Sequence, residues 1–184
     1  MLLKNRQQKV LVENRWLTLF EDCYTLPNGA DCIYYHVHQG DTVMAMVVDG
    51  DQGAESTYIV NQFRLPIDRN IWQFPLGGFD PSQSTPEAMA RVELAEECGL
   101  EVGDIKCVGS FFANPGFSNK KHYVCISSEV LSQQNPDLEE TEYGLISRRV
   151  PIREIPVMIE SGEMGDAWGI TGYFYLQRFL NANN

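Results

Sequence analysis

The segment Ala90–Leu100, ARVELAEECGL, carries three glutamates within five positions of what otherwise reads as an amphipathic helix. At about 100° per residue, Glu96 and Glu97 lie roughly 60° and 40° to either side of Glu93, so the three carboxylates share one narrow face. Like charges at these spacings destabilise a helix by roughly 0.2–0.5 kcal/mol per pair. The cluster therefore predicts a positive ligand between the acids, and oxygen donors suit a hard divalent cation such as Mg²⁺ or Mn²⁺.

The sequence around this helix marks its two ends. Ser84 and Glu87 fit a capping box, Pro86 suits the first turn, and Gly99 is typical of the position just past a helix. The glycine turn Gly77-Gly78 precedes the helix, so its backbone carbonyls can approach the acidic face without an intervening side chain. The alternative is a solvated polar face, which is the usual environment of helix carboxylates.

Composition restricts the classes of protein to consider. The 184 residues are 43% hydrophobic, which is enough for one compact domain or one domain with a small appendage. A net charge of −11 argues against partners such as nucleic acid or an anionic membrane surface. The N-terminus has no signal-peptide pattern and no apolar run approaches ~18 residues, so we expect a cytoplasmic protein. Five widely spaced cysteines predict reduced thiols rather than disulfides or a zinc site.

Strand and helix patterns alternate along the chain without an internal repeat. Short strands are predicted over residues 9–38 around an Asn28-Gly29 turn. Further strands are predicted at 42–49, 56–64, 105–113, 121–127 and 143–150, and further helices near 152–161 and 168–180. This order predicts an α+β fold, an α/β/α sandwich with a small N-terminal antiparallel β subdomain over 1–40 and a main domain over 41–184.

Gly78 and the run Glu93-Leu94-x-Glu96-Glu97-x-Gly99-Leu100 resemble the Nudix box, whose second half is matched at six of seven fixed positions. The resemblance implies a metal-dependent hydrolase that cleaves a nucleoside diphosphate linked to another group. It implies catalytic roles for Glu93 and Glu97 as the principal Mg²⁺ ligands, with Glu96 assisting. A backbone group of the adjacent Gly77 is a further candidate ligand.

Two positions depart from this box. Its intermediate Glu falls on Ser84, and its Arg falls on Val92. Arg91 is rotated by about 140° from Glu96 and cannot simply replace the missing arginine, so we expect it to pair with Glu87. These departures keep a second interpretation open, a Nudix-fold module that binds a nucleotide without hydrolysing it.

The resemblance extends to the branch of ADP-ribose and nucleoside diphosphate sugar pyrophosphatases. The segment Asn61–Pro66 is similar to a strand of that branch whose arginine contacts substrate phosphates or ribose, which implicates Arg64. A strand-edge arginine in a surface ion pair is the alternative. In Trp72-Gln73-Phe74-Pro75, Gln73 replaces a glutamate that sometimes adds a metal ligand in the branch.

Fifteen residues past Leu100, the segment Asn114–Ser118 matches a proline position of the branch and makes Pro115 and Ser118 candidate substrate-binding residues. A plain Pro-Gly turn is the alternative. Residues 120–122, Lys-Lys-His, either supply cations for a diphosphate or form a solvated start to the next strand.

The acidic run Glu139–Tyr143 resembles a loop of the branch in which one glutamate activates water and a second touches metal. The resemblance gives these roles to Glu140 and Glu142 respectively. A charged solvent-exposed loop is the alternative.

Aromatic residues of the N-terminal subdomain are candidates for contacting the base, because in this branch the subdomain is commonly exchanged across a homodimer. Trp16 is the main candidate for contacting the base, and Phe20 and Tyr24 are also available, although packing is the commoner role for such residues. The expected reaction converts a nucleotide sugar into a nucleoside monophosphate and a sugar phosphate, with Mg²⁺ or Mn²⁺ and no organic cofactor.

Overall fold

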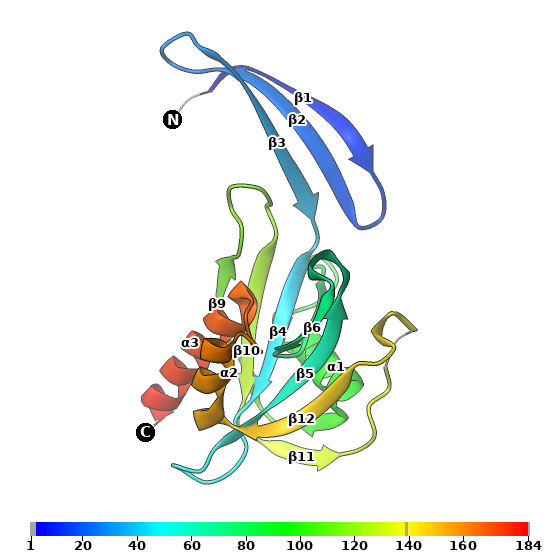
Figure 1. The fold of residues 1–184 in the computed structure, drawn as a ribbon, viewed down its shortest axis with the longest axis vertical. Helices are drawn as coiled ribbons and strands as arrows, with labels where there is room; N and C mark the ends of the chain where they lie inside the picture. Colours follow the sequence, from blue (N-terminus) through cyan, green and yellow to red (C-terminus); the bar gives the residue numbers. More distant parts are fainter. Residues whose placement is uncertain (1–2, 139, 184) are drawn as a thin grey trace.

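The computed structural model describes residues 3–138 and 140–183. Its N-terminal part is an antiparallel sheet of three strands in the order β1-β2-β3, which stands clear of the helices in Figure 1. These strands are β1 (Lys4–Glu13), β2 (Leu17–Thr25) and β3 (Asp31–Gln39). The predicted turn joins β2 and β3, and Gly29 adopts a φ of 88° there. A single residue, Gly40, separates β3 from the first strand of the main body.

The main body contains a mixed sheet in the order β7-β4-β10-β9, in which β4 and β10 are parallel. A second sheet has the order β12-β5-β6, and a two-stranded sheet pairs β11 with β8. The strands are β4 (Asp41–Val47), β5 (Ser56–Arg64), β6 (Arg69–Gln73), β7 (Leu76–Phe79), β8 (Leu100–Val102), β9 (Ile105–Phe112), β10 (Lys121–Ser127), β11 (Val130–Gln133) and β12 (Ile146–Pro151).

Three α-helices and three 3₁₀ turns complete the structure: α1 (Pro86–Cys98), α2 (Ile155–Ser161), α3 (Ala167–Asn183), η1 (Leu65–Ile67), η2 (Glu140–Glu142) and η3 (Ile152–Glu154). The helix predicted near 152–161 therefore divides into η3 and α2. Across the described residues, no helix combines the length and the apolar character that crossing a membrane requires. All five cysteines are free thiols.

Strand β4 explains the layered architecture, because both of its faces are buried. Val43, Ala45 and Val47 belong to one hydrophobic cluster, together with Leu94 of α1. Met44 and Met46 belong to a second cluster, which includes Leu176 of α3. Alternate side chains thus pack against helices on opposite faces, as expected for a central strand. Figure 1 shows α1 on one side of the sheets and α2 and α3 on the other, which confirms the predicted α/β/α sandwich.

Helix α1 begins one residue later than the predicted capping box requires. Thr85, with φ −99° and ψ 154°, is the N-cap, and its hydroxyl accepts a hydrogen bond from Ala88 N at 3.2 Å. Pro86 holds the preceding residue in this extended conformation, which leaves Ser84 too early to cap the helix. Glu87 instead accepts a hydrogen bond from Cys107 N at 3.2 Å. Gly99 ends the helix in the left-handed region, with a φ of 66°, as predicted.

Arg91 does not pair with Glu87 as expected. Its Nη1 donates to the carbonyl oxygen of Val102, at the end of β8. The carboxylate of Glu87 is already used by the backbone of β9, so each side chain ties α1 to a different strand.

Candidate active site

Two of the three glutamates on α1 are buried rather than solvated. Glu93 and Glu97 are 5% and 3% exposed. The carboxylate of Glu93 lies directly against Gly77 of β7, where a Cβ atom would overlap it, whereas a Cβ at Gly78 would meet open space. Gly77 is therefore the glycine that this acidic helix requires, although the box spacing pointed to Gly78.

The surroundings of Glu97 are unfavourable for a negative charge in the metal-free protein. Burial, reinforced by the carboxylates of Glu93 and Glu142, raises the pKa of Glu97 to about 9. The backbone N–H of Leu76 and the charge of Arg64 oppose this rise. Oε2 of Glu97 is buried without a hydrogen-bond partner among the described residues. A buried carboxylate oxygen of this kind fits the ligand of a cation.

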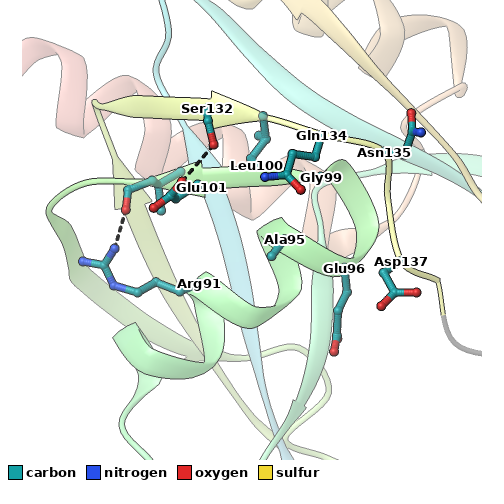
Figure 2. A pocket seen from close by; sticks show the side chains of 11 residues that line it. Arg91, Ala95, Glu96, Gly99, Leu100, Glu101, Ser132, Gln134, Asn135 and Asp137 are labelled. Atoms are coloured by element: carbon teal, nitrogen blue, oxygen red, sulfur yellow. Dashed lines mark hydrogen bonds between the residues drawn. The ribbon is translucent and has the colours of Figure 1, made fainter.

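Glu96 faces a different part of the molecule. It lines a cavity of about 570 Å³ between the C-terminal half of α1, strands β8 and β11, and residues 134–137 (Figure 2). Its backbone carbonyl accepts a hydrogen bond from Asp137 N at 3.0 Å. Adjacent positions on a helix differ by about 100°, which is enough to bury Glu97 while Glu96 turns toward this cavity, which we call the Glu96 cavity.

A larger cavity, of about 620 Å³, opens beside Gly77 and draws its walls from distant parts of the chain. Its volume lies within the range of small-molecule binding sites. Candidate site residues predicted from the sequence line it, among them Trp16, Arg64, Gly77 and Lys120. Arg15 and Trp168, which were not predicted from the sequence, line it as well. We call this space the Gly77 cavity.

Three cationic side chains line the Gly77 cavity. The guanidinium of Arg15 lies 4.3 Å from the ring centroid of Trp16 in the turn between β1 and β2. Burial lowers the pKa of Lys120, Asp41 opposes that change, and the charge of Arg64 adds to it. Positive groups in a concave site favour an anionic ligand, in a protein whose net charge is strongly negative.

Arg64 is held at the wall by two side chains behind it. Its Nε donates to Oε1 of Gln73 at 2.7 Å, and Nε2 of Gln73 donates to Asp166. Burial lowers the pKa of Arg64, and the charges of Glu97 and Asp166 oppose this change. Burial raises the pKa of Asp166, against the hydrogen bonds that it accepts from Gly169 and Gln73.

His122 was a candidate cation, and the structure excludes that role. It is 2% exposed, and burial together with the charge of Lys120 lowers its pKa to about 4, so it is neutral at pH 7. The indole Nε1 of Trp168 donates to its Nε2 at 3.2 Å, which places the imidazole proton on Nδ1, against the hydroxyl of Thr42. His122 therefore anchors Trp168 at the cavity wall. Lys121 lies 4.7 Å from the ring centroid of Tyr123.

Pro115 and Ser118 do not line the Gly77 cavity. Their loop is fastened to the N-terminal sheet, because the carbonyl of Phe117 accepts a hydrogen bond from Val37 N at 2.8 Å. The hydroxyl of Ser118 accepts from Lys120 N at 3.1 Å, so this residue helps to place a cation rather than lining the cavity itself. Phe20 and Tyr24 are also absent from the cavity wall.

Within the acidic run, Glu140–Glu142 form the 3₁₀ turn η2. Glu142 lies close enough to Glu97 to raise its pKa, whereas the side chain of Glu140 is exposed. Glu139 lies outside the described residues. Within the described ranges 3–138 and 140–183, no three His, Cys, Asp or Glu side chains form a group that could hold a metal. The two buried carboxylates on α1 remain a suitable donor set, since Mg²⁺ typically takes one or two carboxylates and completes its shell with water and phosphate.

The sequence did not identify Asp166 and Trp168. Asp166 could have been suspected as an N-cap, because it directly precedes a long helical pattern. Nothing local in the sequence indicates that it contacts Gln73 or that Trp168 faces the cavity.

Comparisons with known proteins identify the family and the fold of the chain. An ADP-ribose pyrophosphatase of Bacillus subtilis is 26% identical over 181 residues, which cover 95% of each chain. An ADP-sugar pyrophosphatase of Mus musculus is 27% identical over 120 residues, covering 61% of this chain and 55% of the relative. A crystal structure described as an ADP compounds hydrolase superposes with a TM-score of 0.82 and 15% identity, covering 100% of this chain and 98% of the other, and so shares the fold. The model of the NUDIX domain matches residues 38–166, and the chain therefore belongs to the Nudix family.

Proposed function

We propose that this protein hydrolyses the pyrophosphate bond of a nucleoside diphosphate sugar, with ADP-ribose as the leading substrate. The products are a nucleoside monophosphate and a sugar phosphate. The observation that carries the proposal is the Gly77 cavity, whose wall includes three cationic side chains, together with Asp41 and Asp80, beside the glycine that contacts Glu93. Relatives named ADP-ribose and ADP-sugar pyrophosphatases support the choice of an ADP-linked substrate.

Glu93 and Glu97 are the residues that would hold a divalent cation, with Mg²⁺ preferred and Mn²⁺ as an alternative. The unpartnered Oε2 of Glu97 and the close approach of Glu93 to Gly77 support this assignment. When bound, the ion neutralises the charge on the diphosphate and stabilises the leaving phosphate. Auxiliary roles for Glu96, Glu142 and the backbone of Gly77 belong to the same proposal, and the position of Glu142 near Glu97 favours it over Glu96.

The protein's own groups bind and orient the substrate. Arg64, Lys120 and Arg15 attract the diphosphate, and the exposed ring of Trp16 offers a face on which a base can stack. Pro115 and Ser118 act through the loop that positions Lys120. Glu140, whose side chain is exposed at the start of η2, accepts the proton of the attacking water.

A homodimer formed through the N-terminal sheet belongs to the same proposal, as does the division into a subdomain over 1–40 and a main domain over 41–184. Apolar side chains of this sheet are exposed, among them Val10, Val12, Ile33 and Tyr35 at 48%, 48%, 61% and 51%. Exposed apolar surface of this extent often marks a protein interface. We propose that the protein is located in the cytoplasm. Light scattering at several protein concentrations tests the dimer.

A coupled phosphate-release assay over a panel of nucleotides and nucleotide sugars tests the activity, with and without Mg²⁺. We expect turnover of ADP-ribose or an ADP-sugar that depends on Mg²⁺ and is lost in Glu97→Gln. Glu101→Gln is the matched control, because Glu101 lines the Glu96 cavity, away from the Gly77 cavity, and accepts a hydrogen bond from Ser132. Saturable binding of ADP-ribose without turnover would replace the hydrolase by the nucleotide-binding module that Ser84 and Val92 leave open.

A further inference from the structure

Arg64 is held from behind by a chain of side chains that ends at the first turn of α3. Nε of Arg64 donates to Gln73, which is 2% exposed, and Gln73 donates to Asp166. We propose that Gln73 and Asp166 are positioning residues that fix the guanidinium of Arg64 toward the phosphates of the substrate. This inference rests on the proposed function, because it assigns Arg64 to the diphosphate.

The donors and acceptors of this chain allow only one arrangement. The Nε–H of arginine can only donate, and a carboxylate can only accept, so the amide oxygen of Gln73 must face Arg64 and its nitrogen must face Asp166. Within the described part of the chain, the two Nη groups of Arg64 make no hydrogen bond. The anchor thus uses the inner edge of the guanidinium and leaves its outer nitrogens for a phosphate, which arginine can bind in a bidentate manner.

Asp166 is itself fixed by a second contact. Its Oδ1 accepts a hydrogen bond from Gly169 N at 2.6 Å, three residues along the chain, which is the geometry of a helix N-cap. A Cβ at Gly169 would lie 2.9 Å from this oxygen, so the close contact depends on glycine. Trp168, in the same turn, lines the Gly77 cavity. The start of α3 therefore sets the positions of both Arg64 and Trp168.

This arrangement explains why residue 73 is a glutamine. A glutamate there would accept from Arg64 but would place its second oxygen against the carboxylate of Asp166. Asp166→Asn would place an amide donor against the amide donor of Gln73, or would lose the cap if the asparagine turned over. We expect each single change to raise KM about tenfold with kcat within about threefold of wild type.

The double variant Gln73→Glu/Asp166→Asn restores the pattern with its polarity reversed. The introduced glutamate would accept from Arg64 and from the asparagine amide, while the asparagine oxygen would keep the cap on Gly169. The net charge of the pair is unchanged. We therefore expect KM to return to within about threefold of wild type, whereas two independent structural defects would multiply.

The experiment measures kcat and KM for ADP-ribose with Mg²⁺ in wild type, both single variants and the double variant, together with melting temperatures and calorimetric titration with ADP. Asp49→Asn is the control for loss of a remote carboxylate, since Asp49 pairs with Arg149 at 2.6 Å. Recovery of KM in the double variant supports the inference. A KM equal to the product of the two single effects, in a wild type that hydrolyses ADP-ribose, overturns it and leaves the proposed function intact.

Two further outcomes are also decisive. If wild type hydrolyses an ADP-sugar but not ADP-ribose, the same kinetic comparison is made with that ADP-sugar. If wild type hydrolyses no nucleoside diphosphate sugar, the proposed function fails, and the inference is judged by ADP affinity in the same four proteins: recovery in the double variant supports it, and no recovery or no ADP binding overturns it. If a single variant does not fold, Arg64→Lys replaces it in the comparison, because lysine keeps the charge but lacks Nε. We expect Arg64→Lys to raise KM about tenfold; a wild-type KM for this variant would overturn the inference.

Discussion

Replacing Glu97 by glutamine removes a buried carboxyl group whose pKa is raised from 4.5 to about 9 in the metal-free protein. Below pH 4.5 the group is protonated in both folded and unfolded chains and costs nothing. Between pH 4.5 and 9 only the unfolded chain ionises freely, so each pH unit subtracts about 1.4 kcal/mol from the free energy of unfolding. At pH 7, 2.5 units above 4.5, this amounts to at most about 3.5 kcal/mol.

Glutamine keeps the shape of Glu97 and removes this cost. We expect metal-free Glu97→Gln to melt above wild type at pH 7 by up to about 7–14 °C, since 1 kcal/mol corresponds to ~2–4 °C for a domain of this size. The difference should vanish near pH 4.5 and grow as the pH rises toward 9. Thermal melts in a chelator over this pH range measure it, with Glu101→Gln as the control.

Added Mg²⁺ should reverse the comparison. Wild type gains stability by binding the ion, whereas the variant has lost a ligand and gains little. The variant should also lose about 10²-fold or more in turnover. A variant less stable than wild type at every pH, or a difference that does not change with pH, would refute the reasoning, because the carboxylate would then be stabilising the metal-free fold.

Three other outcomes test the site. Gly77→Ala should reduce the free energy of unfolding by about 1–3 kcal/mol and impair activity, because its Cβ displaces Glu93, while Gly78→Ala, which meets open space, should be tolerated in parallel melts. Glu140→Gln should lower kcat by about 10² or more with KM little changed, and Glu142→Gln should raise the Mg²⁺ concentration needed for half-maximal rate. If steady-state assays show instead that Glu140→Gln keeps the wild-type kcat and Glu142→Gln loses most of it, the general base is Glu142. ADP-ribose or nucleotide sugars should exceed nucleoside triphosphates at least ~10-fold in kcat/KM, and a preference for triphosphates would overturn the choice of substrate class.

The acidic helix and its partners show how far local sequence reaches. The spacing of Glu93, Glu97 and Gly99 identified the helix and its end, because helical periodicity and glycine conformation act within a few residues. Glu96 and Glu97 were indistinguishable by that criterion, since the burial of a helix carboxylate depends on tertiary packing, such as the contact of Gly77 of β7 with Glu93.

The contacts that the sequence did not reveal join distant segments. Asp166 meets Gln73 across 93 positions, and Trp168 meets His122 across 46. No local pattern encodes such pairs, because they depend on how α3 docks on the sheets. The predicted cap at Ser84 was wrong for a local reason: the following Pro86 holds Thr85 in an extended conformation, so that Thr85 is the N-cap.

The Gly77 cavity is assembled from regions that differ in their freedom to vary. Arg15 and Trp16 come from a surface turn between β1 and β2, where Trp16 is 65% exposed and few neighbours would be disturbed by a change. Any side chain at Gly77 would overlap the carboxylate of Glu93, so this position is closely constrained. If the proposed site is correct, descendants of this sequence can acquire new preferences for the outer part of the ligand through substitutions in one turn, while the buried acids and their glycine are retained.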